Sequence, residues 1–247
     1  MTDVLLLDLG NTRLKWRYNA GPVQIAADWP SLQTQFATLP RPQRILLCSV
    51  KQPELSTEIG HWCQRHWQLG AELLQVSRTA LGVRNHYQLL NQQGPDRWAA
   101  ILGARSHYPQ KNVLVVSAGT ALVVDTLSAA GDYLGGTIGP GLGLMKQALQ
   151  QGTARLPVSS GQNQGFPTQT SDAIETGCRR AIKGMLLEAL SEMAQNNIPA
   201  QQIVCFGGDA ALIASLLNAP CQTVDNLVLD GLYALAQSND GVFVPCV

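Results

Sequence analysis

The fold signal is clearest in the stretch VLLLDLGNTRLK, which runs from Val4 to Lys15. Its first residues form a short apolar run that predicts a buried strand, and Gly10 and Thr12 predict a turn after it. The next apolar run, 14–18, can pair back on that strand as a hairpin. We therefore expect a strand, a turn and a hairpin at this point of the chain.

The same pattern recurs 109 positions later (113 minus 4), where VLVVSAG spans Val113 to Gly119 and continues into Thr120. A further run, 121–126, can again pair back as a hairpin. Two apolar strands can match by chance, and that alternative is open at this point. A true repeat predicts two halves that each begin with a strand and a Gly-Thr turn.

Both turns have the chemistry of a phosphate-binding loop. A glycine at a strand end lets the backbone approach a ligand closely, and exposed N–H groups beside a threonine or asparagine can hold phosphate oxygens. In the first turn, Asp8 can hold Mg²⁺ and Lys15 supplies a positive charge to the phosphates. The alternative is an ordinary hairpin with a surface lysine. Two such turns can hold one polyphosphate between two lobes.

Strand and helix patterns alternate along the rest of the chain, which predicts an α/β fold. The clearest helical pattern covers 172–194, where apolar pairs step by four. A polar break at 109–112 predicts a boundary between an N-terminal lobe, 1–112, and a C-terminal lobe, 113–247. Further strands are expected at 45–50, 113–116, 121–126 and 203–206, and further helices at 55–68, 96–107, 142–151, 210–217 and 227–237.

The composition disfavours several classes of protein. Lysine plus arginine and aspartate plus glutamate number 17 each, and charged residues make up 14% of the 247 residues, against about 25% in an average soluble domain. This balance argues against a disordered chain and against a nucleic-acid partner bound through a basic face. No apolar run approaches the roughly 18 residues of a membrane span, and no signal-peptide pattern is present. We expect a cytoplasmic protein without a membrane partner.

The six cysteines are scattered and contain no C-x-x-C pair, so we expect them to be reduced and mostly buried. Common fingerprints are also absent: there is no G-x-x-x-x-G-K-[ST], no G-x-G-x-x-G after a strand, no G-x-S-x-G and no H-E-x-x-H. A Walker NTPase, a Rossmann dehydrogenase and an α/β-hydrolase are therefore disfavoured.

Six motifs occur in order along the sequence: DLGNTRLK (8–15), GVRNHY (82–87), GPDR (94–97), GT (119–120), GGTIGPG (135–141) and GGD (207–209). Together they make the sequence resemble the type III pantothenate kinases, members of the superfamily of acetate kinase, sugar kinases, heat-shock proteins and actin. The resemblance covers nearly the whole chain and implies two actin-like (ribonuclease H-like) lobes with a nucleotide cleft between them. It also implies ATP-dependent phosphorylation of pantothenate at its 4'-hydroxyl, the first step towards coenzyme A. The cofactors implied are Mg²⁺ and a monovalent cation, potassium or ammonium, and the assembly implied is a homodimer.

Carried over onto this sequence, the resemblance makes Asp96 the catalytic base and assigns pantothenate contacts to Tyr87, Gly94, Pro95 and Arg97. A carboxylate within about 3 Å of a primary hydroxyl can accept its proton. Arg97 can bind the carboxylate of the substrate through two parallel N–H bonds. The alternative for Asp96 is a plain N-cap of the helix that follows.

The resemblance assigns the nucleotide to the two turns. The GGD run is expected near the adenosine or as a strand-to-helix turn, and the 135–141 run either lines the cleft or shapes the junction of the lobes. Thr170 is expected to reach the substrate site across the dimer, with Thr168 and Thr176 as rivals. The expected nucleotide contacts are Asp8, also the magnesium ligand, Leu9, Gly10, Asn11, Thr12, Lys15, Gly119 and Thr120.

Ser117 is a departure from the family pattern. The family usually has an aspartate at this position, where it helps to hold the monovalent cation. Because a hydroxyl lacks the negative charge, both a cation-dependent and a cation-independent enzyme are open. Asp125 either compensates for the missing charge or is a hairpin residue without a role in metal binding.

Two other functions are open at this point: a non-catalytic regulatory or accessory protein of the same fold, and a kinase for another small hydroxyl substrate. The intact Asp96, Arg97 and Thr120 favour an enzyme. The spacing from Tyr87 to Arg97 favours pantothenate over a sugar as the acceptor.

Overall fold

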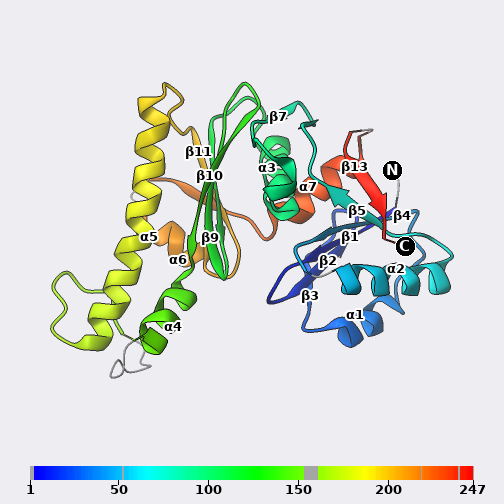
Figure 1. Cartoon of the computed structure of the whole chain (residues 1–247), viewed down its shortest axis with the longest axis horizontal. Coiled ribbons are helices and arrows are strands. Elements are labelled where there is room, and N and C mark those ends of the chain that lie inside the picture. The colour runs from blue at the N-terminus through cyan, green and yellow to red at the C-terminus, as the bar shows by residue number, and fades with distance from the viewer. Residues whose placement is uncertain (1–2, 52, 153–160, 218, 239, 247) are drawn as a thin grey trace. The chain divides into compact units, whose positions relative to one another are not determined.

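The computed structural model describes residues 3–51, 53–152, 161–217, 219–238 and 240–246, and its contacts divide the chain into two units (Figure 1). Unit 1 consists of Met1–Gln110, Ala130–Gly135 and Asp225–Val247. Unit 2 consists of Lys111–Ala129 and Gly136–Val224. The first change of unit lies close to the expected lobe boundary, and the chain then returns to unit 1 twice.

A six-stranded sheet forms the centre of unit 1, in the order β13-β5-β4-β1-β2-β3. β1 (Val4–Leu9) pairs antiparallel with β2 (Leu14–Tyr18) and parallel with β4 (Arg44–Ser49). The strand, turn and hairpin that the sequence predicts here are confirmed. The other strands of this sheet are β3 (Gln24–Ala26), β5 (Glu72–Gln75) and β13 (Val242–Pro245).

Alternation along β1 sends its side chains to two differently covered faces of the sheet. Leu5 and Leu7 pack with Phe36 of α1 (Trp29–Phe36) and Ile59 of α2 (Pro53–Trp67). Asp8 points to the opposite face, where α7 (Leu227–Ala236) contacts β1 and α3 (Pro95–His107) contacts β4. The Asp8 side chain is therefore placed on the face that α3 and α7 cover.

Helices α3 and α7 touch at two glycines. A Cβ atom at Gly103 would overlap the carbonyl oxygen of Leu227, and one at Gly231 would overlap the carbonyl oxygen of Ala99. Only glycine allows the two backbones to approach so closely.

We expect Gly231→Ala to lower the free energy of unfolding of unit 1 by about 1–3 kcal/mol, because the added methyl group must push two packed helices apart. Tryptophan fluorescence during urea unfolding reports on unit 1 alone, since all five tryptophans lie between residues 16 and 98. Gly70→Ala is the matched control, because Gly70 lies in the same unit, has no positive φ and leaves an added Cβ with nothing within 4 Å. The control should leave the fluorescence transition unchanged. An unchanged transition for Gly231→Ala as well would contradict the close packing.

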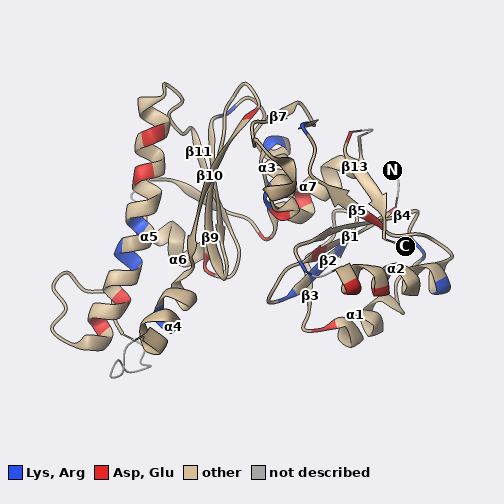
Figure 2. Ribbon diagram, viewed as in Figure 1, with Lys and Arg blue, Asp and Glu red and all other residues tan. Residues whose placement is uncertain are grey.

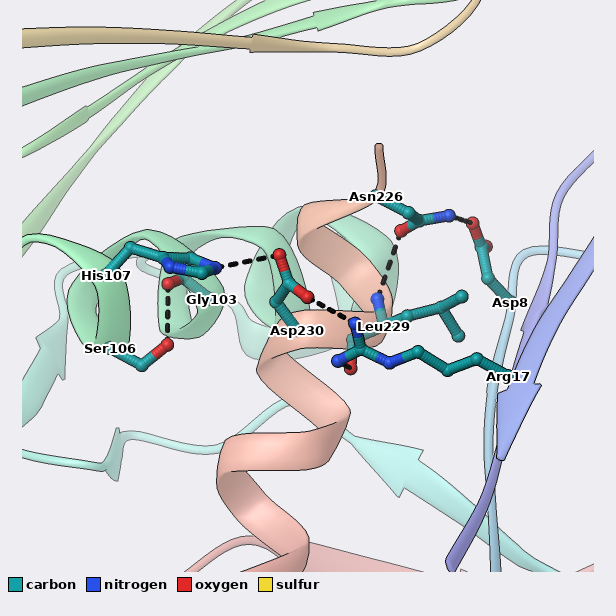
Figure 3. A network of polar contacts seen from close by, with 8 residues as sticks. All are labelled: Asp8, Arg17, Gly103, Ser106, His107, Asn226, Leu229 and Asp230. Carbon is teal, nitrogen blue, oxygen red and sulfur yellow. Dashed lines mark hydrogen bonds and ion pairs between the residues drawn. The ribbon is translucent and has the colours of Figure 1, made fainter. Parts of the chain in front are cut away.

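A network of charged groups ties α7 to β2 and α3 (Figure 3). Asp230 Oδ1 pairs with Arg17 Nη1 at 2.6 Å, and Asp230 Oδ2 pairs with His107 Nε2 at 2.8 Å. Arg17 Nη2 also donates to the carbonyl oxygen of Leu229 at 2.9 Å. The side chains of Arg17 and Asp230 are only 10% and 17% exposed. The network therefore anchors α7 on the sheet from a largely buried position.

Unit 2 repeats the strand order of unit 1. Its sheet runs β12-β11-β8-β9-β10, and the corresponding strands of unit 1 run β5-β4-β1-β2-β3. β8 (Val113–Ala118) pairs antiparallel with β9 (Ala121–Leu127) and parallel with β11 (Gln202–Phe206), as β1 does with β2 and β4. The internal repeat in the sequence is thus a repeat of structure, and the alternative of a chance match is wrong. β12 (Cys221–Thr223) pairs parallel with β11.

Among its described residues, unit 2 contains the helices α4 (Leu142–Gly152), α5 (Thr170–Gln195) and α6 (Ala210–Leu216). Ile182 of α5 and Ile213 of α6 join Leu114 of β8 in the apolar core. The helices predicted from the sequence are confirmed in both units, with small shifts at their ends. Among the described residues, no helix is long and apolar enough to cross a membrane. Charged residues are spread thinly over the described elements (Figure 2).

β10 (Asp132–Pro140) begins in unit 1 and ends in unit 2. In unit 1, its first residues pair parallel with β7 (Val83–Asn85), which pairs antiparallel with β6 (Thr79–Ala80). A short 3₁₀ helix, η1 (Leu90–Gln92), follows before α3. The glycine-rich run at 135–141 is therefore mostly strand.

Candidate functional site

Asp8 lies near the end of β1, and its carboxylate is held by a residue from the other end of the chain (Figure 3). Asn226 Nδ2 donates to Asp8 Oδ2 at 2.9 Å, and Asn226 Oδ1 accepts the backbone N–H of Leu229 at 3.0 Å. Asn226 is the N-cap of α7 and is only 1% exposed. Because the capping bond fixes the amide, the other bond sets the direction of the Asp8 carboxylate.

The Asp8 carboxylate also lies among other charges of unit 1. Burial raises its pKa above the ordinary 3.8, the hydrogen bond from Asn226 and the positive charge of Lys15 lower it, and the negative charge of Asp96 raises it. Lys15 is the residue opposite Asp8 in the register of β1 and β2. Asp8, Lys15 and Asp96 are therefore close enough for their charges to interact, although they are distant in the sequence.

We expect Asp8→Asn to raise the thermal midpoint of unit 1 near neutral pH. The raised pKa means that the folded state holds the carboxyl proton more tightly than the unfolded state, so folding stability is lost as pH rises through the pKa of Asp8. An amide has no such proton, and its oxygen can still accept the bond from Asn226. Thermal unfolding followed by tryptophan fluorescence checks this, and the gain should disappear near the ordinary carboxyl pKa of 3.8.

Asp132→Asn is a control in the same unit, and it should shift the thermal midpoint in the opposite direction. Hydrogen bonds from Arg84 and His86 lower the pKa of Asp132 to about 2. Its ionised form therefore contributes stability at neutral pH that is lost as pH falls through about 2. Asp132→Asn should lower the midpoint near neutral pH, whereas a lower midpoint for Asp8→Asn would contradict a destabilising buried carboxylate.

Asp96 lies in the first turn of α3, directly before Arg97. Its Oδ1 accepts the backbone N–H of Arg97 at 2.8 Å, beside the positive end of the helix dipole. The N-cap of α3 is Gly94 and Pro95 is its first residue, so the interpretation of Asp96 as the N-cap is wrong. A Cβ atom at Gly94 would overlap Asp96 Oδ1. Glycine at 94 therefore leaves the space that the Asp96 carboxylate occupies.

Arg97 and Tyr87 form a fixed pair next to Asp96. Arg97 Nη1 donates to the Tyr87 hydroxyl at 3.1 Å, and the guanidinium lies 5.5 Å from the centre of the Tyr87 ring. Arg97 is only 7% exposed, and the Tyr87 ring stacks on Tyr133 at 6.4 Å between centroids. The predicted substrate residues Tyr87, Gly94, Pro95 and Arg97 are thus brought to the first turn of α3.

Two buried amides support this region and are absent from the predicted site. Asn85 Nδ2 donates to Gln93 Oε1 at 2.7 Å, and Asn85 Oδ1 accepts the backbone N–H of Tyr87 at 3.1 Å. Asn85 is 2% and Gln93 4% exposed. Asn85 belongs to the GVRNHY motif, which is the signal that could have found it. Together the two amides hold the segment that carries Tyr87 against the segment that leads to Gly94.

In unit 2, the end of β8 gathers three glycine motifs of the sequence. The carbonyl oxygen of Thr120 accepts the N–H of Gly141 at 2.9 Å, and that of Ala118 accepts the N–H of Asp209 at 3.0 Å. A Cβ atom at Gly141 would overlap the Thr120 carbonyl oxygen. The motifs that meet here are 119–120, 135–141 and 207–209.

Ser117 and Asp125 lie on the hairpin that leads into this turn. In the register of β8 and β9, Ser117 is opposite Val123 and Asp125 is opposite Val115. Their side chains therefore share one face of the sheet, with Asp125 further from the turn. Asp125 is 3% exposed.

The threonines expected near the substrate differ in their surroundings. Thr170 is exposed at the first turn of α5, and Thr168 is exposed just before it. Thr176 is 2% exposed, and its Oγ1 accepts the N–H of Gln164 at 3.0 Å. Thr176 therefore holds its own neighbouring segment in place, whereas Thr170 and Thr168 both stay candidates for a ligand contact.

Solved structures show the class to which this fold belongs. A Campylobacter jejuni protein described as a conserved candidate member of the Baf family of transcriptional activators matches with a TM-score of 0.64 at 22% identity, covering 94% of this chain and 98% of that one. A glucokinase from an Antarctic psychrotroph matches with a TM-score of 0.52 at 13% identity, covering 96% and 100%. The fold is thus the α/β fold of actin-like proteins and sugar kinases, as the sequence predicts.

The sequence comparison is more specific. The family model for the type III pantothenate kinases matches residues 4–192. A type III pantothenate kinase of Aromatoleum aromaticum is 37% identical over 242 residues, which cover 96% of this chain and 98% of that protein. The chain belongs to the type III pantothenate kinase family.

Proposed function

We propose that the protein transfers the γ-phosphoryl group of ATP to the 4'-hydroxyl of pantothenate, with Asp96 as the base. The observation that carries this proposal is the first turn of α3, where Asp96 and Arg97 are adjacent and the charge of Asp96 acts on Asp8. Unit 1 therefore contains the proposed base, Asp96, the proposed anchor for the carboxylate of pantothenate, Arg97, and the proposed magnesium ligand, Asp8.

Asp96 performs the proton transfer in this mechanism. The primary hydroxyl of pantothenate must lose its proton as it attacks the γ-phosphorus, and a positioned carboxylate typically contributes about 10²–10⁴-fold to such a step. The bond from the Arg97 N–H to Asp96 Oδ1 limits how the carboxylate can rotate. The proton is thus accepted at a defined place.

Arg97 anchors the other end of the acceptor. A guanidinium binds a carboxylate through two parallel N–H bonds, which fixes orientation as well as position. The Tyr87 hydroxyl and ring hold the Arg97 guanidinium, and Gly94 and Pro95 shape the backbone beside it. Two contacts at opposite ends of pantothenate place the hydroxyl for in-line attack.

Each turn, taken within its own unit, offers backbone N–H groups to nucleotide phosphates, and Lys15 adds a positive charge beside the first turn. The residues in these roles are Leu9, Gly10, Asn11 and Thr12 in the first turn and Gly119 and Thr120 in the second. The turn at 207–209 contributes on the adenosine side.

Asp8 fits a magnesium site that relies on the substrate for most of its ligands. The described residues contain no group of three or more His, Cys, Asp or Glu side chains that could hold a metal. Mg²⁺ commonly uses one or two carboxylates together with phosphate oxygens and waters, and Asp8, oriented by Asn226, supplies such a carboxylate. When bound, the ion neutralises charge on the phosphates.

Further features of the assembly follow from the family resemblance. We propose that the lobes expected at 1–112 and 113–247 correspond to units 1 and 2, with residues 130–135 and 225–247 belonging to unit 1. We also propose that the active form is a cytoplasmic homodimer and that Thr170 reaches the substrate site across it. We also propose that Ser117 weakens the monovalent cation site, because it lacks the charge of an aspartate. Potassium or ammonium should then raise turnover less in this protein than in a Ser117→Asp variant.

A coupled ADP-release assay tests the function. The purified protein is given ATP, Mg²⁺ and pantothenate in sodium, potassium or ammonium salts, and 4'-phosphopantothenate is identified by mass spectrometry. We expect turnover in at least one salt. A folded protein without turnover in any of them would overturn the proposed function.

Panthenol, in which an alcohol replaces the carboxylate of pantothenate, is the control substrate for the proposed role of Arg97. It retains the hydroxyl to be phosphorylated but gives Arg97 no anion to bind. We expect panthenol to have a much higher KM than pantothenate in the parent protein. Equal KM values for the two acceptors would remove Arg97 from the proposed role.

A further inference from the structure

Two cysteines of unit 2 lie in contact on neighbouring strands. The Sγ atoms of Cys205 on β11 and Cys221 on β12 are 2.8 Å apart. The strands are parallel with Cys221 opposite Ile203, so the two cysteines share one face of the sheet and are diagonal neighbours. Their Sγ–Sγ distance is about 0.75 Å longer than the roughly 2.05 Å of a disulfide bond (2.8 minus 2.05).

One member of the pair is accessible and the other is protected. Cys205 is fully buried in the apolar core of unit 2, whereas Cys221 is half-buried. Cys221 also belongs to β12, which is the last strand at its edge of the sheet. An oxidant that arrives from solvent therefore meets Cys221 first.

Cys221 also has the character of an attacking thiol. The hydrogen bond from Cys205 lowers the pKa of Cys221, and the thiolate is the reactive form of cysteine. The other five cysteines all have raised pKa values. The hydrogen bond to Cys221 is the main cause at Cys205. Burial is the main cause at Cys48, Cys63, Cys178 and Cys246. Cys221 is thus distinguished from the rest by its surroundings.

We propose that Cys205 and Cys221 form a reversible disulfide when the protein meets a peroxide. The Cys221 thiolate attacks one oxygen of hydrogen peroxide, the O–O bond breaks, and a sulfenic acid and hydroxide result. The sulfur of Cys205 then attacks the sulfur of Cys221, the S–O bond breaks, and water leaves with the proton of Cys205. In balance, two thiols and one hydrogen peroxide give one disulfide and two waters, and a dithiol reductant restores the pair.

The disulfide joins the edge strand covalently to β11. The segment that it closes contains the turn at 207–209 and α6, and the N–H of Asp209 in that turn donates to Ala118 at the end of β8. The bond therefore acts on the part of unit 2 where the three glycine motifs meet. The proposal does not depend on the kinase activity.

Peptide mapping of the full-length protein after treatment with hydrogen peroxide tests the proposal. Trypsin cannot separate the two cysteines, because no lysine or arginine follows Lys183. A protease that cuts after aspartate and glutamate releases Cys205 in peptide 193–209 and Cys221 in peptide 210–225. We expect these peptides to be linked, with a mass equal to their sum less two hydrogens, and to separate on reduction with a dithiol.

Two variants control the experiment. Cys221→Ser should abolish the link and leave Cys205 as a thiol. Cys246→Ser removes the other half-buried cysteine, which lies in unit 1, and should leave the link intact. A Cys221 that is oxidised to a sulfinic or sulfonic acid without a link overturns the proposal. So does a protein in which peroxide modifies Cys246 while Cys205 and Cys221 stay thiols, or in which both stay thiols at every peroxide concentration.

Discussion

Asp96→Asn is expected to lower kcat by about 10²–10⁴-fold and to leave the affinity for ATP nearly unchanged. An amide cannot accept the proton of the attacking hydroxyl. Its oxygen can still accept the N–H of Arg97, which Asp96 Oδ1 binds at 2.8 Å, so α3 should begin as it does in the parent protein. Initial rates at saturating ATP and pantothenate measure kcat, and isothermal titration calorimetry measures ATP affinity.

Asp28→Asn is the matched control for this experiment. Asp28 is a true N-cap, whose Oδ1 accepts the N–H of Ser31 at the start of α1 at 2.9 Å. The same chemical change there should leave kcat as it is. Equal kcat values for Asp96→Asn and the parent protein would remove Asp96 from the mechanism. A loss of ATP affinity at unchanged kcat would assign Asp96 to the nucleotide instead.

Asp230→Ala is expected to lower the free energy of unfolding of unit 1 by about 3–5 kcal/mol, because it leaves the charge of a buried arginine without its partner. Arg17 is 10% exposed at the side chain and pairs with Asp230 at 2.6 Å. The change also removes the acceptor of His107 Nε2 on α3. Urea unfolding followed by tryptophan fluorescence measures the loss, since the tryptophans lie in unit 1.

Glu72→Ala is the control for this experiment, because it removes the acidic partner of a more exposed ion pair. Glu72 pairs with Arg44 at 2.9 Å in the same unit, but these side chains are 34% and 31% exposed. Such a pair contributes about 0–1 kcal/mol, so the control should shift the transition little. Losses of equal size in the two variants would show that burial of the Arg17 pair adds nothing.

The central strands and the long helices could be predicted from the sequence because their signals are local. β1 and β8 are continuous apolar runs, and α5 repeats apolar pairs over many turns. The short outer strands carry no such signal. β12, for example, has only three residues, Cys221–Thr223, none of them fully buried. It is a strand because β11 supplies its hydrogen-bonding partner, which the pattern of its own residues cannot reveal.

Helix α1 was missed although its signal is present. Asp28 caps it, Pro30 lies in its first turn, and Trp29, Leu32 and Phe36 have helical spacing. The helix has only eight residues, too few for the spacing of its apolar residues to distinguish a helix from a strand. Its apolar residues complete the core on the face of β1 opposite Asp8.

The candidate site divides in the same way between local and distant signals. Asp96 and Arg97 stand in a recognisable motif, and the structure corrects only the role of Asp96 as a helix cap. Asn226 could not be found, because its partner Asp8 is 218 positions away in the chain. A buried amide that orients a carboxylate becomes visible only once α7 is placed on the sheet.

Unit 1 cannot be completed during translation until its last helix has been made. Asn226 and Asp230 bind Asp8 and Arg17, which are synthesised before any residue of unit 2. By the time Asn226 emerges from the ribosome, every residue of unit 2 has already been made. A nascent chain arrested before residue 226 carries Asp8 without the amide that orients it. It also lacks α7, which packs against Gly103 of α3. We therefore expect the second unit to fold first on the ribosome and the Asp8 carboxylate to be oriented last.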